Sequence, residues 1–209
     1  GRVVLDGVDL LRLPERDLNG IRGRHIGCVF QEPQSALNPV MPVGRQLTAA
    51  LRRHHGLTRA QAREAAVELA TMVDLPTPAE TIRRYPHELS GGQRQRVVIA
   101  MAMSCRPRLL LADEPTTALD STVQARVLDL LLDLTLRERT GVVLVTHDLA
   151  VAARTSERLV VMRHGRVVET GTTADVLAAP QDAYTAELLA AARDTSLGSD
   201  PVTTGRGPR

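Results

Sequence analysis

The fold is decided by the stretch Leu109-Leu110-Leu111-Ala112-Asp113-Glu114, in which an apolar run leads directly into two adjacent acids. A continuous apolar run of this kind is typical of a parallel strand that is buried on both faces of a sheet. In an open α/β sheet, ligands bind beyond the carboxyl ends of the strands. We therefore expect Asp113 and Glu114 to lie at the ligand-binding edge of a mainly parallel sheet.

These two acids suit phosphoryl chemistry. Asp113 can hold Mg²⁺, directly or through a water, because a hard cation needs hard oxygen ligands. Glu114 can polarise a water for in-line attack on a phosphoryl group. Taken alone, however, the pair is interpreted equally well as a solvated turn at the end of a strand.

Two further polar residues follow apolar strands. Gln31 comes after the run 26–30, and His147 comes after the run 142–145; we expect both runs to be buried strands. The ends of parallel strands meet at one edge of a sheet, so both side chains are expected beside the acids. The glutamine offers a carbonyl oxygen to Mg²⁺ and an amide to a water, whereas the imidazole can bind a γ-phosphate and hold the attacking water. Taken singly, Gln31 would be interpreted as an ordinary loop residue, and His147 as a residue that caps a helix.

A fourth feature is a glycine-rich helix start. Ser90 is a good N-cap for a helix that begins directly behind it with Gly91 and Gly92 and continues into the apolar run 97–103. Glycines at this position let backbone N–H groups approach a phosphate, which the helix dipole also favours. An ordinary capped helix is the alternative, but the full string from Leu89 to Arg96 is too specific for it.

Composition excludes several classes of protein. The 209 residues include one Phe, two Tyr and no Trp, with a net charge of +2, so nucleic acid would find neither a stacking platform nor a strong field. No apolar run approaches the ~20 residues that span a bilayer, and we expect neither a membrane-embedded nor a secreted protein. Cys28 and Cys105 lie in apolar stretches, and we expect both to be buried, reduced thiols.

Together these features resemble the ATPase subunit of ABC transporters. The stretch from Leu89 to Gln93 is similar to the signature, with Ser90, Gly91, Gly92 and Gln93 as its residues. The stretch from Leu109 to Glu114 is similar to the Walker B strand with its catalytic glutamate. Ala118-Leu119-Asp120 is similar to the D-loop, His147 is similar to the switch histidine, and Gln31 is similar to the Q-loop glutamine. The resemblance implies an α/β P-loop NTPase core with a mainly parallel sheet and an inserted helical subdomain. It also implies ATP and Mg²⁺ as cofactors.

The resemblance further implies a division into four segments. Residues 1–33 would be the remaining N-terminal part of the ATPase core, 34–105 the helical signature subdomain, and 106–175 the core with Walker B and the switch histidine. Residues 176–209 would be a C-terminal helical extension with a disordered tail, which we place at residues 194–209. In the family, the signature serves a nucleotide held by a second ATPase subunit, so the implied partners are that subunit, in a homodimer or heterodimer, and transmembrane permease subunits. A solute-binding protein outside the membrane would be an indirect partner, and the chain would lie peripherally on the cytoplasmic face of the cell membrane.

A narrower resemblance concerns the solute. The loop at residues 31–39 and the helix at 183–189 are similar to those of the dipeptide, oligopeptide and nickel importer branch. The implied function is therefore ATP-driven import of peptides or a related small solute such as nickel. The alternatives are a truncated, non-catalytic ABC module and a non-transport ABC ATPase.

One family element is missing from these residues. All 26 basic residues are arginine, so the lysine of the Walker A motif G-x-x-x-x-G-K-[ST] cannot be supplied within this sequence. We expect either a fragment of a full ATPase or a native truncation, and the starting point favours a fragment. Because phosphoryl transfer depends on positioning and charge stabilisation, we expect these 209 residues alone to hydrolyse no ATP.

Overall fold

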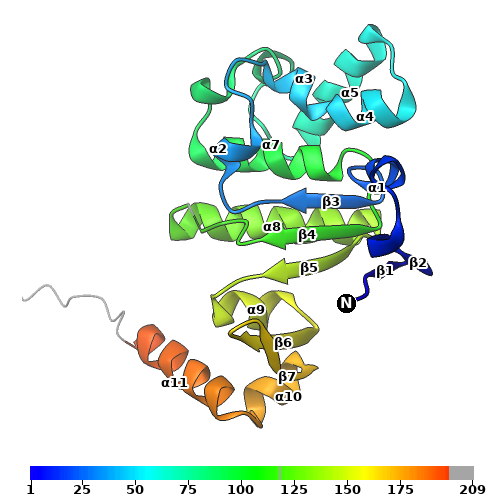
Figure 1. Cartoon of the computed structure of the whole chain (residues 1–209). Coiled ribbons are helices and arrows are strands. Elements are labelled where there is room, and N and C mark those ends of the chain that lie inside the picture. The colour runs from blue at the N-terminus through cyan, green and yellow to red at the C-terminus, as the bar shows by residue number, and fades with distance from the viewer. Residues whose placement is uncertain (118, 198–209) are drawn as a thin grey trace, which may run out of the picture. The chain divides into compact units, whose positions relative to one another are not determined.

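A computed structural model describes residues 1–117 and 119–197 of the chain. The chain forms two compact units, a first unit of Gly1–Val145 and a second unit of Thr146–Arg209. Figure 1 labels the elements of both. The division into four segments implied by the family resemblance stays a prediction, and each unit is described by itself.

The first unit contains the strands and helices that carry most of the candidate site. Its strands are β1 (Val4–Leu5), β2 (Val8–Asp9), β3 (Ile26–Val29), β4 (Leu109–Asp113) and β5 (Gly141–Val145). Its α-helices are α1 (Glu15–Ile21), α2 (Pro33–Ala36), α3 (Val43–Leu47), α4 (Ala49–His55), α5 (Arg59–Met72), α6 (Pro78–Thr81), α7 (Gly91–Met103) and α8 (Ser121–Glu138), and its 3₁₀ turns are Leu10–Arg12 and Pro86–Glu88.

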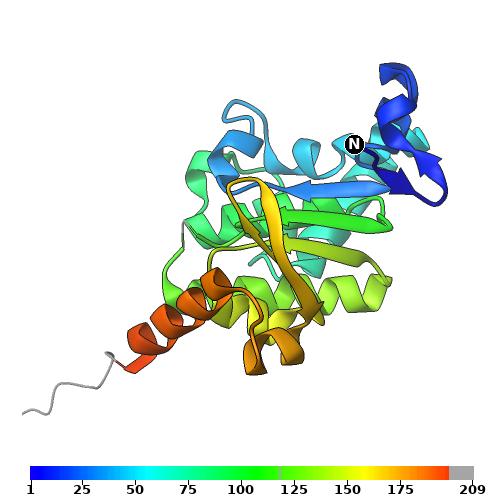
Figure 2. The same ribbon diagram turned by 60° about the horizontal axis from the view of Figure 1, so that its bottom comes forward.

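The centre of the first unit is a parallel sheet in the order β3-β4-β5, which both views show side by side (Figures 1 and 2). β3 and β5 each pair with β4 in parallel, and Cys28, Leu111 and Val143 lie opposite one another in one row across the three strands. The prediction of a mainly parallel sheet is confirmed. All three strands end at the same edge.

One face of this sheet carries the main core. Leu110 and Ala112 are fully buried together with side chains of α7 and α8 such as Ile99 and Leu131. α7 approaches β3 so closely that a Cβ atom on Gly27 would lie 2.5 Å from the carbonyl oxygen of Ala102. Any side chain at Gly27 would push α7 away from the sheet.

The opposite face is exposed, so the prediction of strands buried on both faces is wrong for this chain. Leu111 is 37% exposed and Val143 49% exposed. Cys28, in the same row, is exposed as well, and Cys105 is partly exposed, which corrects the expectation of two buried thiols. The predicted strands are apolar at successive positions. Successive side chains along a strand nevertheless point to opposite faces of the sheet, so every second one lies on the face that α7 and α8 do not cover.

The segment between Gln31 and Ser90 is helical, as expected. Its longest helix, α5, has 14 residues and begins at a capping box formed by Thr58 and Gln61. The buried Gln46 fixes the loop before α3, because it accepts a hydrogen bond from the Asn38 N–H and donates to the carbonyls of Asn38 and Met41. No helix in this segment approaches the length of an extended coiled coil.

The second unit is a hairpin with helices around a small core. It comprises α9 (Leu149–Thr155), β6 (Arg158–Arg163), β7 (Arg166–Thr172), α10 (Thr173–Ala178) and α11 (Ala183–Leu197). His164 and Gly165 both have positive φ, 49° and 74°, as a tight two-residue hairpin requires. Since α11 continues to Leu197, the predicted disorder is wrong for residues 194–197, and residues 198–209 lie outside the described residues.

Candidate functional site

The structure brings Gln31 and Glu114 into direct contact at the carboxyl edge of the sheet. The Gln31 Nε2 donates a hydrogen bond of 2.8 Å to the Glu114 Oε2, across 83 residues of sequence. Gln31 follows β3 and Glu114 follows the adjacent strand β4, so parallel pairing brings both residues to the same edge of the sheet. This contact agrees with the expectation that both residues lie at one edge.

Glu114 is held at its backbone as well as its side chain. Its N–H donates to the carbonyl of Val145 at 2.9 Å, and its φ is +44°, in the left-handed region that non-glycine residues rarely adopt. Thr117 donates its hydroxyl to the same Oε2 at 3.1 Å. The sequence analysis did not select Thr117; the only signal was a hydroxyl residue within the turn after the acids.

Asp113 is the last residue of β4 and lies opposite Val145 of β5. Its side chain belongs to the exposed face, two residues beyond Leu111. A carboxylate here, with the Gln31 side chain at the end of the neighbouring strand, gives two hard oxygen donors at one edge. Within the described residues no three His, Cys, Asp or Glu side chains gather as a metal site, so these two donors would be only part of a coordination shell.

The signature residues form the capped start of α7. Ser90 is the N-cap: its Oγ accepts from the Gln93 N–H at 3.3 Å, and the Gln93 Oε1 accepts from the Ser90 N–H at 3.0 Å. This reciprocal capping box leaves Gly91 and Gly92 in the first turn, where backbone N–H groups have no partner within the helix. The turn has the donors and the dipole that an anion needs.

Asp120 caps the start of α8, next to the signature. Its Oδ1 accepts a 3.0 Å hydrogen bond from the Val123 N–H. Leu119 lies beside Gly91, and Val123 beside Gly92. The sequence did not predict that the D-loop and the signature of one chain meet. Ala118, the first residue of the D-loop, lies outside the described residues.

His147 lies in the turn between β5 and α9 and belongs to the second unit. Its neighbours fix this turn: the Thr146 Oγ1 accepts from the Asp148 N–H at 3.0 Å, and the Asp148 Oδ1 accepts from the Ala150 and Val151 N–H groups. The helix cap is therefore Asp148, which argues against a capping role for His147. Its approach to the acids stays a prediction.

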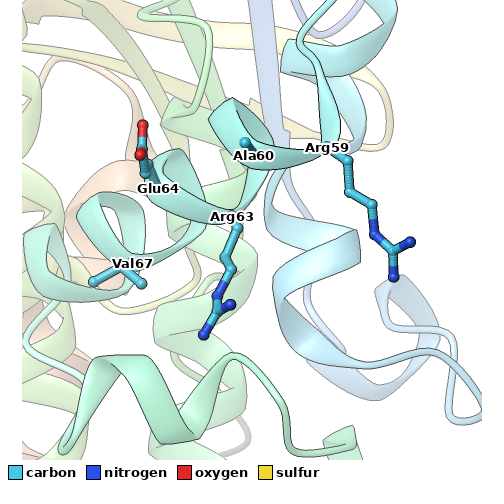
Figure 3. A pocket seen from close by; sticks show the side chains of 5 residues that line it. All are labelled: Arg59, Ala60, Arg63, Glu64 and Val67. Atoms are coloured by element: carbon cyan, nitrogen blue, oxygen red, sulfur yellow. The ribbon is translucent and has the colours of Figure 1, made fainter.

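A hollow of about 810 Å³ lies along α5 and contains none of these residues. Figure 3 shows its lining, which comes from one stretch of that helix: Arg59, Ala60, Arg63, Glu64 and Val67. It is a shallow feature of the helical segment, separate in sequence from the motifs. No helix within residues 1–117 and 119–197 is long and apolar enough to cross a membrane.

Residues 1–117, more than half of the sequence, match the family described as ABC transporter. The chain belongs to the ABC transporter family. The matched range includes Gln31, the signature and the acids at 113 and 114, whereas Asp120 and His147 lie beyond it.

Named relatives and solved structures agree with this assignment. The chain is 46% identical to the oligopeptide transport ATP-binding protein OppD of Bacillus subtilis, with 91% of this chain and 53% of OppD covered. It is 43% identical to the dipeptide transport ATP-binding protein DppD of the same species, with 97% of this chain and 61% of DppD covered. A dimeric post-hydrolysis structure of the ATP-binding cassette MJ0796, bound to ADP and Pi, superposes with a TM-score of 0.73 at 32% identity, covering 83% of this chain and 73% of the other. The predicted α/β P-loop NTPase fold is confirmed, and the chain spans about half the length of the curated relatives it matches.

Proposed function

We propose that this chain is part of the ATP-hydrolysing subunit of an ABC transporter that imports peptides. The observation that carries the proposal is the contact between Gln31 and Glu114 at the carboxyl edge of a parallel sheet, in a chain of this family. Family membership implies nucleotide binding. The names of the relatives, which are oligopeptide and dipeptide transport proteins, support a peptide rather than nickel as the solute.

In this proposal Glu114 is the general base. Its carboxylate accepts the proton of a water that attacks the γ-phosphate in line, and the bonds from Gln31 and Thr117 fix the carboxylate oxygen in place. His147 would bind the γ-phosphate and orient that water. A fixed base matters because most of the rate enhancement in phosphoryl transfer comes from positioning and charge stabilisation.

Mg²⁺ and ATP are the proposed cofactors. Asp113 and the carbonyl oxygen of Gln31 would hold the metal, and they suit it because both are hard oxygen donors, while Mg²⁺ normally completes its shell with water and phosphate. When bound, the metal would neutralise charge on the phosphates. The Gln31 amide nitrogen is engaged with Glu114, so its carbonyl oxygen is the atom suited to a cation.

The signature implies a second ATPase subunit as partner. Ser90, Gly91, Gly92 and Gln93 would receive the phosphates of a nucleotide held mainly by that subunit, in a homodimer or heterodimer. We further propose that the helical segment 34–105 docks on a transmembrane permease subunit. The complex would lie on the cytoplasmic face of the membrane and receive its solute from an external binding protein.

Glu114→Gln in the complete transporter tests the assignment of the base. The amide keeps the shape of the side chain but cannot accept the proton, so ATP turnover should fall by about 10²-fold or more. ATP binding should persist. Glu187→Gln, at an exposed position of α11 outside the proposed sites, is the matched control and should turn over ATP like the wild type. An unaltered rate in Glu114→Gln would refute the role of Glu114.

A further inference from the structure

The first turns of α7 and α8 approach each other more closely than side chains normally allow. A Cβ built on Gly92 would lie 2.7 Å from the Cγ1 of Val123, whereas ordinary contact begins at 3.4 Å. A Cβ on Gly91 would lie 3.6 Å from the Cδ2 of Leu119, which is an ordinary contact. The approach of the two helices therefore requires glycine at position 92 but not at position 91.

Val123 cannot easily give way to a side chain at position 92. Its side chain is β-branched and has one strongly preferred rotamer in a helix. It is partly buried and packs against the main core, and Val127, one turn further along α8, is fully buried. Making room at position 92 would therefore mean moving the start of α8.

Val123 also holds the D-loop through its backbone. Its N–H is the donor to the Asp120 Oδ1, so one residue contacts the signature with its side chain and the D-loop with its amide. The signature turn is itself stiffened by the capping box of Ser90 and Gln93. A displacement of either turn is passed to the other.

We propose that Val123 is a positioning residue, which sets the place of the signature turn relative to the Asp120 turn through its contact with Gly92. This inference rests on the proposed function, in which both turns meet nucleotide or the second subunit. It gives Gly92 a role inside the chain, in addition to the outward role of letting a phosphate approach. A methyl group added at position 92 would disturb both roles. Removing the Val123 Cγ1 makes room for that methyl group inside the chain, but it makes no room on the side from which a phosphate approaches.

A double-mutant cycle on thermal stability tests the contact. In the complete transporter ATPase, Gly92→Ala should lower Tm by roughly 5 °C, the scale expected for an overpacked site in a domain of this size. Combined with Val123→Ala, the same change should lower Tm by less than about 1 °C relative to Val123→Ala alone. Gly91→Ala is the matched control and should leave Tm unchanged. Equal losses in the two backgrounds would overturn the contact.

The same variants in an ATPase assay test the positioning role. A shift of the signature turn by several tenths of an ångström should make Gly92→Ala at least about tenfold slower in kcat. In the Val123→Ala background this loss of kcat should disappear. A contact that affected only stability would cause no loss of kcat in the first place, at a temperature where all variants are folded. If Tm is restored but kcat is not, the outward role of Gly92 governs activity and the positioning role is overturned. An unaltered rate in Glu114→Gln would refute the role of Glu114 in the proposed function, while the Tm cycle would still report on the contact.

Discussion

Replacing Leu110 by alanine should destabilise the first unit far more than replacing Leu111, although the two are neighbours on β4. Leu110 is 0% exposed, in the core shared with α7 and α8. Truncation there leaves a cavity, and Leu→Ala at fully buried sites costs about 3–4 kcal/mol of unfolding free energy. Leu111 is 37% exposed on the open face. Its truncation removes three carbon atoms that are only partly buried and leaves no closed cavity, so at about 0.8 kcal/mol per buried methylene group we expect a loss of about 1.5 kcal/mol.

Urea unfolding measures both values. The chain contains no Trp, so far-UV circular dichroism is the suitable probe. Because the chain has two compact units, hydrogen exchange of the β4 and β5 peptides should be followed in parallel, so that the change is assigned to the first unit. The slope of free energy against urea should stay constant across the variants.

Val143→Ala is the control for the open face. Val143 lies opposite Leu111 and is 49% exposed, and its truncation removes two carbon atoms, so it should cost about 1 kcal/mol or less. A loss at Leu111 equal to that at Leu110 would refute one-sided burial of the sheet.

Three further changes probe other parts of the chain. Gln46→Ala should lower the unfolding free energy by about 2–3 kcal/mol in urea melts, because it leaves three backbone groups of a partly buried loop unpaired. Cys28 should react with a maleimide faster than Cys105 in the native chain, since it is the more exposed thiol; burial raises the pKa of both, so both rates should still rise above pH 9.0, as mass spectrometry would show. The neighbouring Thr185 hydroxyl and hydrogen bonds from the backbone N–H groups of Gln181 and Asp182 lower the pKa of Glu169 below 4.5, so its contribution to stability is present above that pH and lost as the pH falls through the lowered value. Thermal melts of Glu169→Gln should accordingly show a smaller loss of stability on acidification than the wild type.

Features set by neighbouring residues could be predicted from the sequence. The local sequence predicts Ser90 as a helix N-cap, and it caps α7 in the structure. Asp120 was named only through the family resemblance, and its capping of α8 was not predicted. The hairpin at His164-Gly165 depends only on a turn that tolerates positive φ. Gln31 and the acids could be placed at one edge because parallel strands leave no other arrangement for their ends.

Contacts between distant segments could not be predicted. The run at Leu109–Ala112 is apolar throughout, and nothing in it tells which face a helix covers; the positions of α7 and α8 decide that. The same holds for the approach of Val123 to Gly92, which depends on how two helices cross. Thr117 was missed because its bond depends on the backbone conformation of Glu114, which no sequence pattern specifies.

That conformation explains how the strand can end in two acids. Alternation along β4 places Ala112 on the covered face and Asp113 on the exposed face, so a continued strand would turn Glu114 back toward the apolar core. A buried, unpaired carboxylate would cost several kcal/mol. The left-handed residue at Glu114, with φ of +44°, breaks the alternation at a cost of about 1–2 kcal/mol. The hydrogen bonds from Gln31 and Thr117 to the carboxylate, at about 1.5–3 kcal/mol each, are large enough to offset this strain. The contacts that fix the proposed base are therefore also those that make its backbone conformation tenable.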